Sequence, residues 1–243
     1  MSIAPVESPA RESSARTADS RDRIWLESIA IQDFRNLERV NLNFPAEGVA
    51  LIGDNGHGKT NLLEAIYYLQ ILRSIRDARD QDLTRFDAAG FHVAAKVHSP
   101  APHEIGVGFE RASKKKRVTV NGLVPRRMSD ALGNLPSVMF SPRDLELVSG
   151  APSERRRYLD LLLALTDRKY LNALQHYRAN LARRNAALRN ATKRGANDSE
   201  VSVWEPALAE HGSVLIESRA KWVNESASVG PTARLSFSLS TAV

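Results

Sequence analysis

The feature that most constrains this chain is a glycine-rich segment, Gly53–Thr60, with the sequence Gly-Asp-Asn-Gly-His-Gly-Lys-Thr. It matches the P-loop pattern G-x-x-x-x-G-K-[ST] at every fixed position. A short apolar run, Gly48–Ile52, precedes it and predicts a buried strand, and Asn61–Leu72 follows it with the apolar spacing of a helix. This order of strand, glycine loop and helix is the setting in which such a loop binds nucleotide phosphates.

The residue types in the loop suit that chemistry. Its glycines permit backbone angles that let N–H groups face phosphate oxygens. Lys59 is expected to reach the β- and γ-phosphates of ATP, and the Thr60 hydroxyl is expected to ligate Mg²⁺. Asp54 and His57 are expected to be spacers, and no residue is predicted to be catalytic. The predicted cofactor-binding residues are the whole loop: Gly53, Asp54, Asn55, Gly56, His57, Gly58, Lys59 and Thr60.

The composition excludes several other kinds of site. The 243 residues contain no cysteine, which rules out disulfides, thiolate metal sites and cysteine nucleophiles. The six histidines lack metal-ligand spacing, and no apolar stretch is long enough to cross a membrane. The formal charge of +6 suits a polyanion such as nucleic acid, although a basic charge also serves solubility alone. Without a recognisable export signal, the cytoplasm is the expected compartment.

The sequence pattern of the first part of the chain predicts a disordered tail followed by an ATP-binding head. Residues 1–22 lack apolar periodicity and are expected to be a disordered tail. Residues 23–150 are expected to form the N-terminal part of an ATP-binding head. Two strands precede the P-loop, a β-meander follows it, and the apolar segment Ser137–Phe140 predicts a further strand.

The second part predicts a helical lobe. Residues 151–228 suggest an antiparallel helical hairpin, with one helix from Ser153 to about Asn190 and another from about Val203 to Ser226. A break is expected at 195–198. Residues 229–243 alternate like the start of a return to the head, with a strand over 234–239.

Several segments resemble one family. The residues Gly58-Lys59-Thr60-Asn61-Leu62-Leu63-Glu64-Ala65-Ile66 resemble the P-loop of the SMC and RecF group of ABC-type ATPases, which also open with two strands like 26–44. Later segments resemble RecF DNA replication and repair proteins in the same order: Arg73–Arg76, Val120–Gly122, Phe140–Leu145, Gly150–Asp160 and Arg183–Leu188. The resemblance implies an α/β fold, a P-loop ABC-ATPase-like head (mixed sheet plus β-meander) with an inserted α-helical hairpin lobe.

The same resemblance implies a function. It suggests an ATP- and Mg²⁺-dependent clamp that binds single-stranded and gapped duplex DNA and forms a homodimer when ATP is bound. It further suggests cooperation with RecO and RecR in recombinase loading, and support of replication and the SOS response to DNA damage. Two motifs of these ATPases, the signature turn and the Walker B acid, are absent from the sequence. The expectation is a chain that lacks the family's C-terminal part and hydrolyses ATP poorly.

Two basic clusters are candidate DNA contacts. Lys114, Lys115, Lys116 and Arg117 lie at a predicted hairpin tip. Arg73 and Arg76 follow the P-loop helix, among acidic residues that would also pair with them. Phosphate contact is one interpretation, and a solvated turn or local salt bridges are the other.

Two other functions compete with the repair interpretation. A P-loop kinase or small-substrate phosphotransferase would need a substrate pocket and lid, and the opening strand pair and helical hairpin argue against it. An SMC-like chromosome-organising ATPase would need heptads sustained over a longer arm. Salt-dependent DNA binding would separate the kinase from both DNA-binding alternatives.

Overall fold

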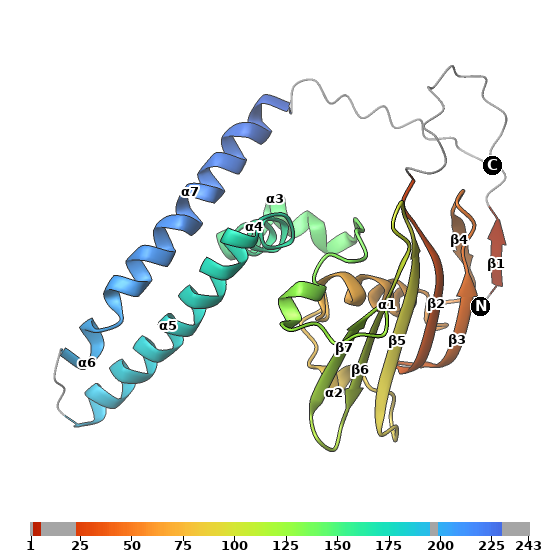
Figure 1. Cartoon of the computed structure of the whole chain (residues 1–243), viewed down its shortest axis with the longest axis horizontal. Coiled ribbons are helices and arrows are strands. Elements are labelled where there is room, and N and C mark those ends of the chain that lie inside the picture. The colour runs from red at the N-terminus through yellow and green to blue at the C-terminus, as the bar shows by residue number, and fades with distance from the viewer. Residues whose placement is uncertain (1, 6–22, 195–198, 230–243) are drawn as a thin grey trace. The chain divides into compact units, whose positions relative to one another are not determined.

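The computed structural model describes residues 2–5, 23–194 and 199–229, and the chain divides into two compact units, Met1–Phe140 and Ser141–Val243 (Figure 1). The sequence placed this boundary after Gly150. It lies earlier because the residues just after Phe140 form two short helical turns, η3 (Pro142–Leu145) and α3 (Glu146–Ser149). The turn η3 packs on α3, and α3 packs on the helix that follows, so both turns belong to the second unit.

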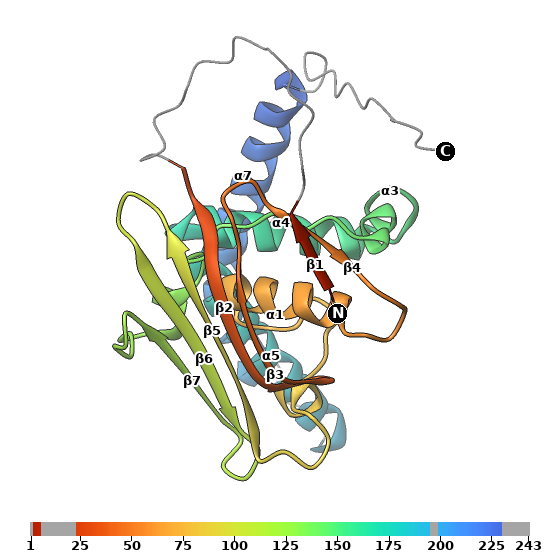
Figure 2. The same cartoon turned by 90° about the vertical axis from the view of Figure 1, so that its right-hand side faces the viewer.

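The first unit is built on a five-stranded antiparallel sheet with the order β3-β2-β5-β6-β7 (Figure 2). Helix α1 lies against one face of this sheet, where it contacts β2, β5 and β6 (Figures 1 and 2). The strands are β2 (Trp25–Phe34), β3 (Leu37–Asn43), β5 (Gly90–His98), β6 (His103–Glu110) and β7 (Lys115–Val120). The helical segments are α1 (Lys59–Ile71), α2 (Asp80–Leu83) and η2 (Met128–Ala131).

Alternation along the strands explains why one face of the sheet is covered. In β5, Val93, Ala95 and Val97 are buried, whereas His92 and Lys96 are exposed. Successive side chains of a strand point to opposite faces, so this pattern buries one face and leaves the other in water. The consecutive strands β5, β6 and β7 form the meander that the sequence predicts.

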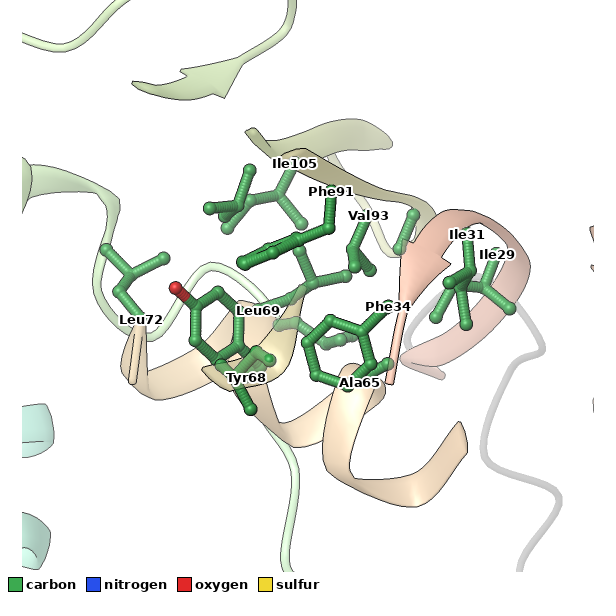
Figure 3. Packing of buried hydrophobic residues seen from close by; sticks show 14 of the residues in the cluster. Ile29, Ile31, Phe34, Ala65, Tyr68, Leu69, Leu72, Phe91, Val93 and Ile105 are labelled. Carbon is green, nitrogen blue, oxygen red and sulfur yellow. The ribbon is translucent and has the colours of Figure 1, made fainter. Parts of the chain in front are cut away.

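Aromatic rings from the sheet and from α1 meet in the core of this unit (Figure 3). Phe34, Tyr68 and Phe91 contact one another edge to face, with ring centroids 5.2 to 5.9 Å apart. Such geometry stabilises a core beyond the burial of apolar area. Phe34 ends strand β2, so the same packing that holds the core also fixes the turn that follows this residue.

Strand β4 (Val49–Ile52) leads into the P-loop and pairs antiparallel with β1 (Ser2–Pro5). The expectation of a disordered tail is therefore wrong for Ser2–Pro5. A strand with a free edge presents unpaired N–H and C=O groups, and a short extended segment can pair with them. The rest of the predicted tail, 6–22, lies outside the described residues. All strand pairings in the described part of the chain are antiparallel.

The strand predicted at Ser137–Phe140 does not form. Val138 and Phe140 are exposed, and the Ser137 hydroxyl donates a hydrogen bond to Gln70 Oε1 at 2.5 Å. Prolines on both sides of the segment cannot donate to a strand ladder, and no described strand lies beside it to pair. Apolar composition alone was therefore a misleading signal here.

The second unit is helical. It contains α4 (Pro152–Thr166), α5 (Arg168–Arg194), α6 (Ser199–Ser202) and α7 (Glu205–Val229). The long helices α5 and α7 pack side by side as the predicted hairpin (Figure 1). The predicted break at 195–198 and the predicted strand at 234–239 lie outside the described residues.

The first predicted helix, from Ser153 to about Asn190, is in fact two helices that meet at Asp167. The Asp167 carboxylate accepts hydrogen bonds from the backbone N–H groups of Lys169 and Tyr170, at 2.7 and 3.2 Å. It thereby caps the start of α5 in the way that aspartate favours at this position. The break was detectable in the sequence as an aspartate three residues before the apolar residues Tyr170 and Leu171.

A buried carboxylate, Asp160 of α4, joins the three long helices of this unit. It accepts hydrogen bonds from the Tyr170 hydroxyl and the Arg178 guanidinium of α5, at 2.5 and 3.1 Å. It also pairs with Arg219 of α7 at 2.6 Å. Burial lowers the pKa of Arg219, but its hydrogen bonds with Asp160 and Tyr170 outweigh burial and raise the pKa on balance. Asp160 is therefore a structural group of the helical unit.

The Tyr170 hydroxyl makes this unit sensitive to high pH. Burial, with the hydrogen bond to Asp160, raises the pKa of Tyr170 from 10.0 to about 12. Because the folded-state pKa is the higher one, the stabilisation is complete below pH 10 and is lost as the pH rises toward 12. We expect the melting temperature to fall across this interval and Tyr170→Phe to flatten the fall, measured by circular dichroism at constant ionic strength. Equal pH profiles for the variant and the wild type would contradict this.

Candidate nucleotide-binding loop

The glycine-rich loop spans the gap between β4, which ends at Ile52, and α1, which begins at Lys59. Gly56 and Gly58 both have a φ of +86°, a region that side chains rarely tolerate. Gly58 has a second reason to be glycine. A Cβ atom there would lie 2.7 Å from Leu37 Cδ2 and 3.0 Å from Asn36 Oδ1. The start of α1 therefore lies directly against the turn between β2 and β3.

The N-terminus of α1 suits an anion. The helix begins without a side-chain cap and carries no acidic residue in its first turn. Its first N–H groups thus keep their hydrogen-bonding capacity, and the helix dipole adds partial positive charge at the same end. Around Gly56, a Cβ atom would meet nothing within 4 Å, so the loop is open at that residue. The residues present therefore fit the phosphates of a nucleotide.

Lys59 folds back onto the loop that precedes it. Its ammonium group donates hydrogen bonds to the carbonyl oxygens of Gly53 and Asp54, at 2.5 and 2.8 Å. Thr60 lies beside it and is exposed, so its hydroxyl is accessible to a metal ion. The side chains of Asp54, Asn55 and His57 are also exposed. The structure thus brings all eight predicted residues together in the loop and the first turn of α1.

A buried ion-pair network lies next to this loop, and the sequence analysis missed it. Glu64 of α1 is fully buried, and its carboxylate is held by Arg35, Ser74 and Arg76. The available signal was a glutamate on the same helix face as Leu62, Ala65 and Tyr68, where a charged residue requires partners.

The basic residues proposed for DNA contact separate into two groups. Lys116 pairs with Asp80 at 2.8 Å, donates to the Leu72 carbonyl oxygen at 2.7 Å and lies over the Tyr68 ring. Arg76 pairs with Glu64 at 3.6 Å. Both side chains are thus engaged within the first unit.

The second group faces solvent. Alternation along β7 turns Lys116 toward the core, so its neighbours Lys115 and Arg117 are exposed on the other face. Lys114, in the turn before the strand, is exposed as well, and so is Arg73. Lys114, Lys115 and Arg117 are therefore accessible to a phosphate backbone, whereas Arg73, although exposed, also interacts within the protein.

Within 2–5, 23–194 and 199–229, no helix is long and apolar enough to cross a membrane. The same residues contain no group of three or more histidines and carboxylates arranged to hold a metal ion.

Comparisons with known proteins agree with this geometry. Residues 24–121 match a sequence family described as "Protein of unknown function (DUF2813)". Relatives called "DNA replication and repair protein RecF" occur in Leptospira biflexa (36% identity over 203 residues), Bacteroides fragilis (37% over 202) and Oenococcus oeni (38% over 207). These matches cover 82–83% of this chain but 54–55% of each relative. The chain therefore spans about half the length of these relatives.

Solved structures give the same result. Two structures of "the recombination mediator protein RecF" in the "RecFOR pathway", one with ATP and one with ATPrS, superpose with a TM-score of 0.77. Their sequence identities are 30% and 31%, and the matches cover 84–85% of this chain and 55–56% of theirs. The fold and the loop thus define a P-loop head of the ABC-ATPase-like fold, with a helical lobe. Over the matched residues, the chain is similar in sequence and fold to RecF DNA replication and repair proteins.

Proposed function

We propose that this chain binds ATP through residues 53–60 and acts in DNA replication and repair. The observation that carries the proposal is the uncapped, glycine-led N-terminus of α1, with Lys59 folded over it, in a chain 36–38% identical to RecF proteins. Lys59 would pair with the terminal phosphates, and the loop N–H groups would hold the phosphate oxygens. The Thr60 hydroxyl would ligate a Mg²⁺ ion, which supplies charge neutralisation when bound.

The proposed nucleic-acid partner is single-stranded or gapped duplex DNA. Lys114, Lys115 and Arg117 form an exposed basic tip on the meander, and such cations contact phosphates without reading sequence. By resemblance to the family, we further propose cooperation with RecO- and RecR-type proteins in recombinase loading and SOS induction. An ATP-dependent homodimer in the cytoplasm belongs to the same proposal.

The experiment is a titration of mant-ATP, a fluorescent ATP analogue, with Mg²⁺ into the wild-type chain and into Lys59→Ala. The wild type should bind, and Lys59→Ala should bind at least tenfold more weakly, because a charge-assisted contact to phosphate is lost. Phosphate release by the wild type should stay at the level of the variant, since the sequence contains no Walker B acid or signature turn. Equal binding by the two proteins would refute the assignment of the loop.

The DNA arm of the experiment uses a gapped duplex at several salt concentrations, with and without Mg-ATP. Binding should weaken as salt rises, because contacts to phosphates release counterions. Binding that is absent at low salt would remove the DNA part of the proposal and leave the nucleotide part standing.

A further inference from the structure

A line of polar side chains connects the P-loop to the turn between β2 and β3. Asn36, in that turn, donates from Nδ2 to the Gly56 carbonyl oxygen at 2.9 Å. Its Oδ1 accepts a hydrogen bond from Asn61 Nδ2 at 2.8 Å. Asn61 follows Thr60 in the first turn of α1, so Asn36 links the middle of the loop to the start of the helix.

The buried carboxylate of Glu64 anchors this line at two places. Arg35, the chain neighbour of Asn36, contacts both Glu64 oxygens, Nε to Oε2 at 3.2 Å and Nη2 to Oε1 at 3.1 Å. Arg76 lies 3.6 Å from Glu64 and 3.4 Å from Asn61 Oδ1. The Ser74 hydroxyl donates to Glu64 Oε1 at 2.6 Å. Both routes from Glu64 therefore converge on Asn36.

The position of Glu64 in the core gives this network its stiffness. A fully buried carboxylate is stable only with partners, and two guanidinium groups and a hydroxyl supply them here. Bidentate arginine–carboxylate pairs also fix geometry, because both groups are planar and meet in one orientation. Asn36 itself is exposed, so the network runs from the core to the surface of the loop.

The peptide unit between Gly56 and His57 is the point on which the network acts. Asn36 holds the Gly56 carbonyl oxygen of this unit. The N–H of the same unit, which belongs to His57, points to the opposite side because the peptide is planar and trans. The His57 N–H points toward the Asp54 carbonyl oxygen at 3.4 Å. Holding the carbonyl therefore sets the direction of a loop N–H group.

We infer that Asn36 and Glu64 are positioning residues for nucleotide binding, which hold the Gly56–His57 peptide in its binding orientation before the phosphates arrive. This inference rests on the proposed function of the loop. Preorganisation of this kind raises affinity because less order has to be imposed on binding. Neither residue belongs to the G-x-x-x-x-G-K-[ST] pattern, and neither side chain is proposed to contact the nucleotide.

The test is the dissociation constant of mant-ATP for Asn36→Ala, Glu64→Gln and the double variant. We expect each single variant to bind roughly tenfold more weakly, the scale of one lost hydrogen bond in a fixed site. The affinity of the double variant for mant-ATP should equal that of the single variant with the lower affinity, because both changes release the same Gly56–His57 peptide unit. Independent effects would instead multiply, as they do for unconnected sites.

Asp160→Asn is the matched control for Glu64→Gln. It neutralises another buried, arginine-paired carboxylate, but in the second unit. We expect it to lower the melting temperature and leave the dissociation constant unchanged. Asn36→Ala should raise the dissociation constant and leave the melting temperature nearly unchanged, because Asn36 is exposed and contributes little to stability. If Glu64→Gln does not fold, Asn61→Ala replaces it, since Asn61 lies on the same line.

The outcomes separate the inference from the function on which it rests. Wild type that binds no better than Lys59→Ala removes the nucleotide site itself. Wild type that binds, together with Asn36→Ala and Glu64→Gln of wild-type affinity, overturns the positioning role alone. Multiplied losses in the double variant overturn it too, because the two residues would then act separately.

Discussion

Replacement of Phe34 by alanine is expected to lower the free energy of unfolding of the first unit by about 3–5 kcal/mol. Phe34 is fully buried, and its ring contacts Tyr68 of α1 and Phe91 of β5 edge to face. Its removal leaves a cavity between the sheet and the helix that carries the P-loop. Arg35 and Asn36 follow directly, so mant-ATP affinity should fall with stability.

Urea unfolding, monitored by circular dichroism, measures the loss of free energy of unfolding in Phe34→Ala. Binding of mant-ATP is measured on the same samples. Phe86→Ala is the matched control, because the Phe86 side chain is 85% exposed and the same atoms are removed. It should change the free energy of unfolding by less than about 0.5 kcal/mol. Equal stability of the two variants would show that the ring cluster does not hold this unit together.

Replacement of Asp160 by alanine is expected to cost the helical unit about 3 kcal/mol of stability, the lower end for breaking a buried ion pair. Arg219 and the Tyr170 hydroxyl would lose their shared acceptor inside the unit. The cost stays at the lower end because Arg178, the third partner, is 54% exposed and regains water.

Tryptophan fluorescence during urea unfolding measures this prediction, because Trp222 packs against the core of the helical unit. Lys221→Ala is the matched control. It removes one partner of the exposed Lys221–Glu225 pair on the same helix as Arg219, with N···O 3.9 Å, and should cost less than about 0.5 kcal/mol. An Asp160→Ala variant as stable as this control would show that Asp160 does not join the helices.

Local patterns identified most elements but failed where a partner decided the outcome. The alternation in β5 and β6 predicted the meander, and the apolar spacing of Asn61–Leu72 predicted helix α1. Ser137–Phe140 has the composition of a strand, yet no described strand pairs with it. Ser2–Pro5 has no such composition, yet it pairs with β4. Strand pairing depends on an available edge, which a local window of sequence does not contain.

The candidate site divides in the same way. The eight residues could be singled out because the motif is contiguous, and the role expected of each glycine, of Lys59 and of Thr60 follows from its own chemistry. Lys116 was grouped with its basic neighbours because they share a charge, and alternation along β7 then turned it toward Asp80 and Tyr68. The charge of a lysine can be read from the sequence, but whether its side chain is exposed depends on the face of the strand on which it lies.

The sequence by itself determined the glycine-rich loop, the strand before it, the helix after it and the helical hairpin, because each depends on residues close together in the chain. Only the tertiary structure showed that Asn36 holds the Gly56 carbonyl and that Arg35, Ser74 and Arg76 meet at Glu64. These contacts join positions 10 to 29 residues apart. Their partners are selected by the packing of α1 on the sheet, and burial is what makes a lone glutamate require them.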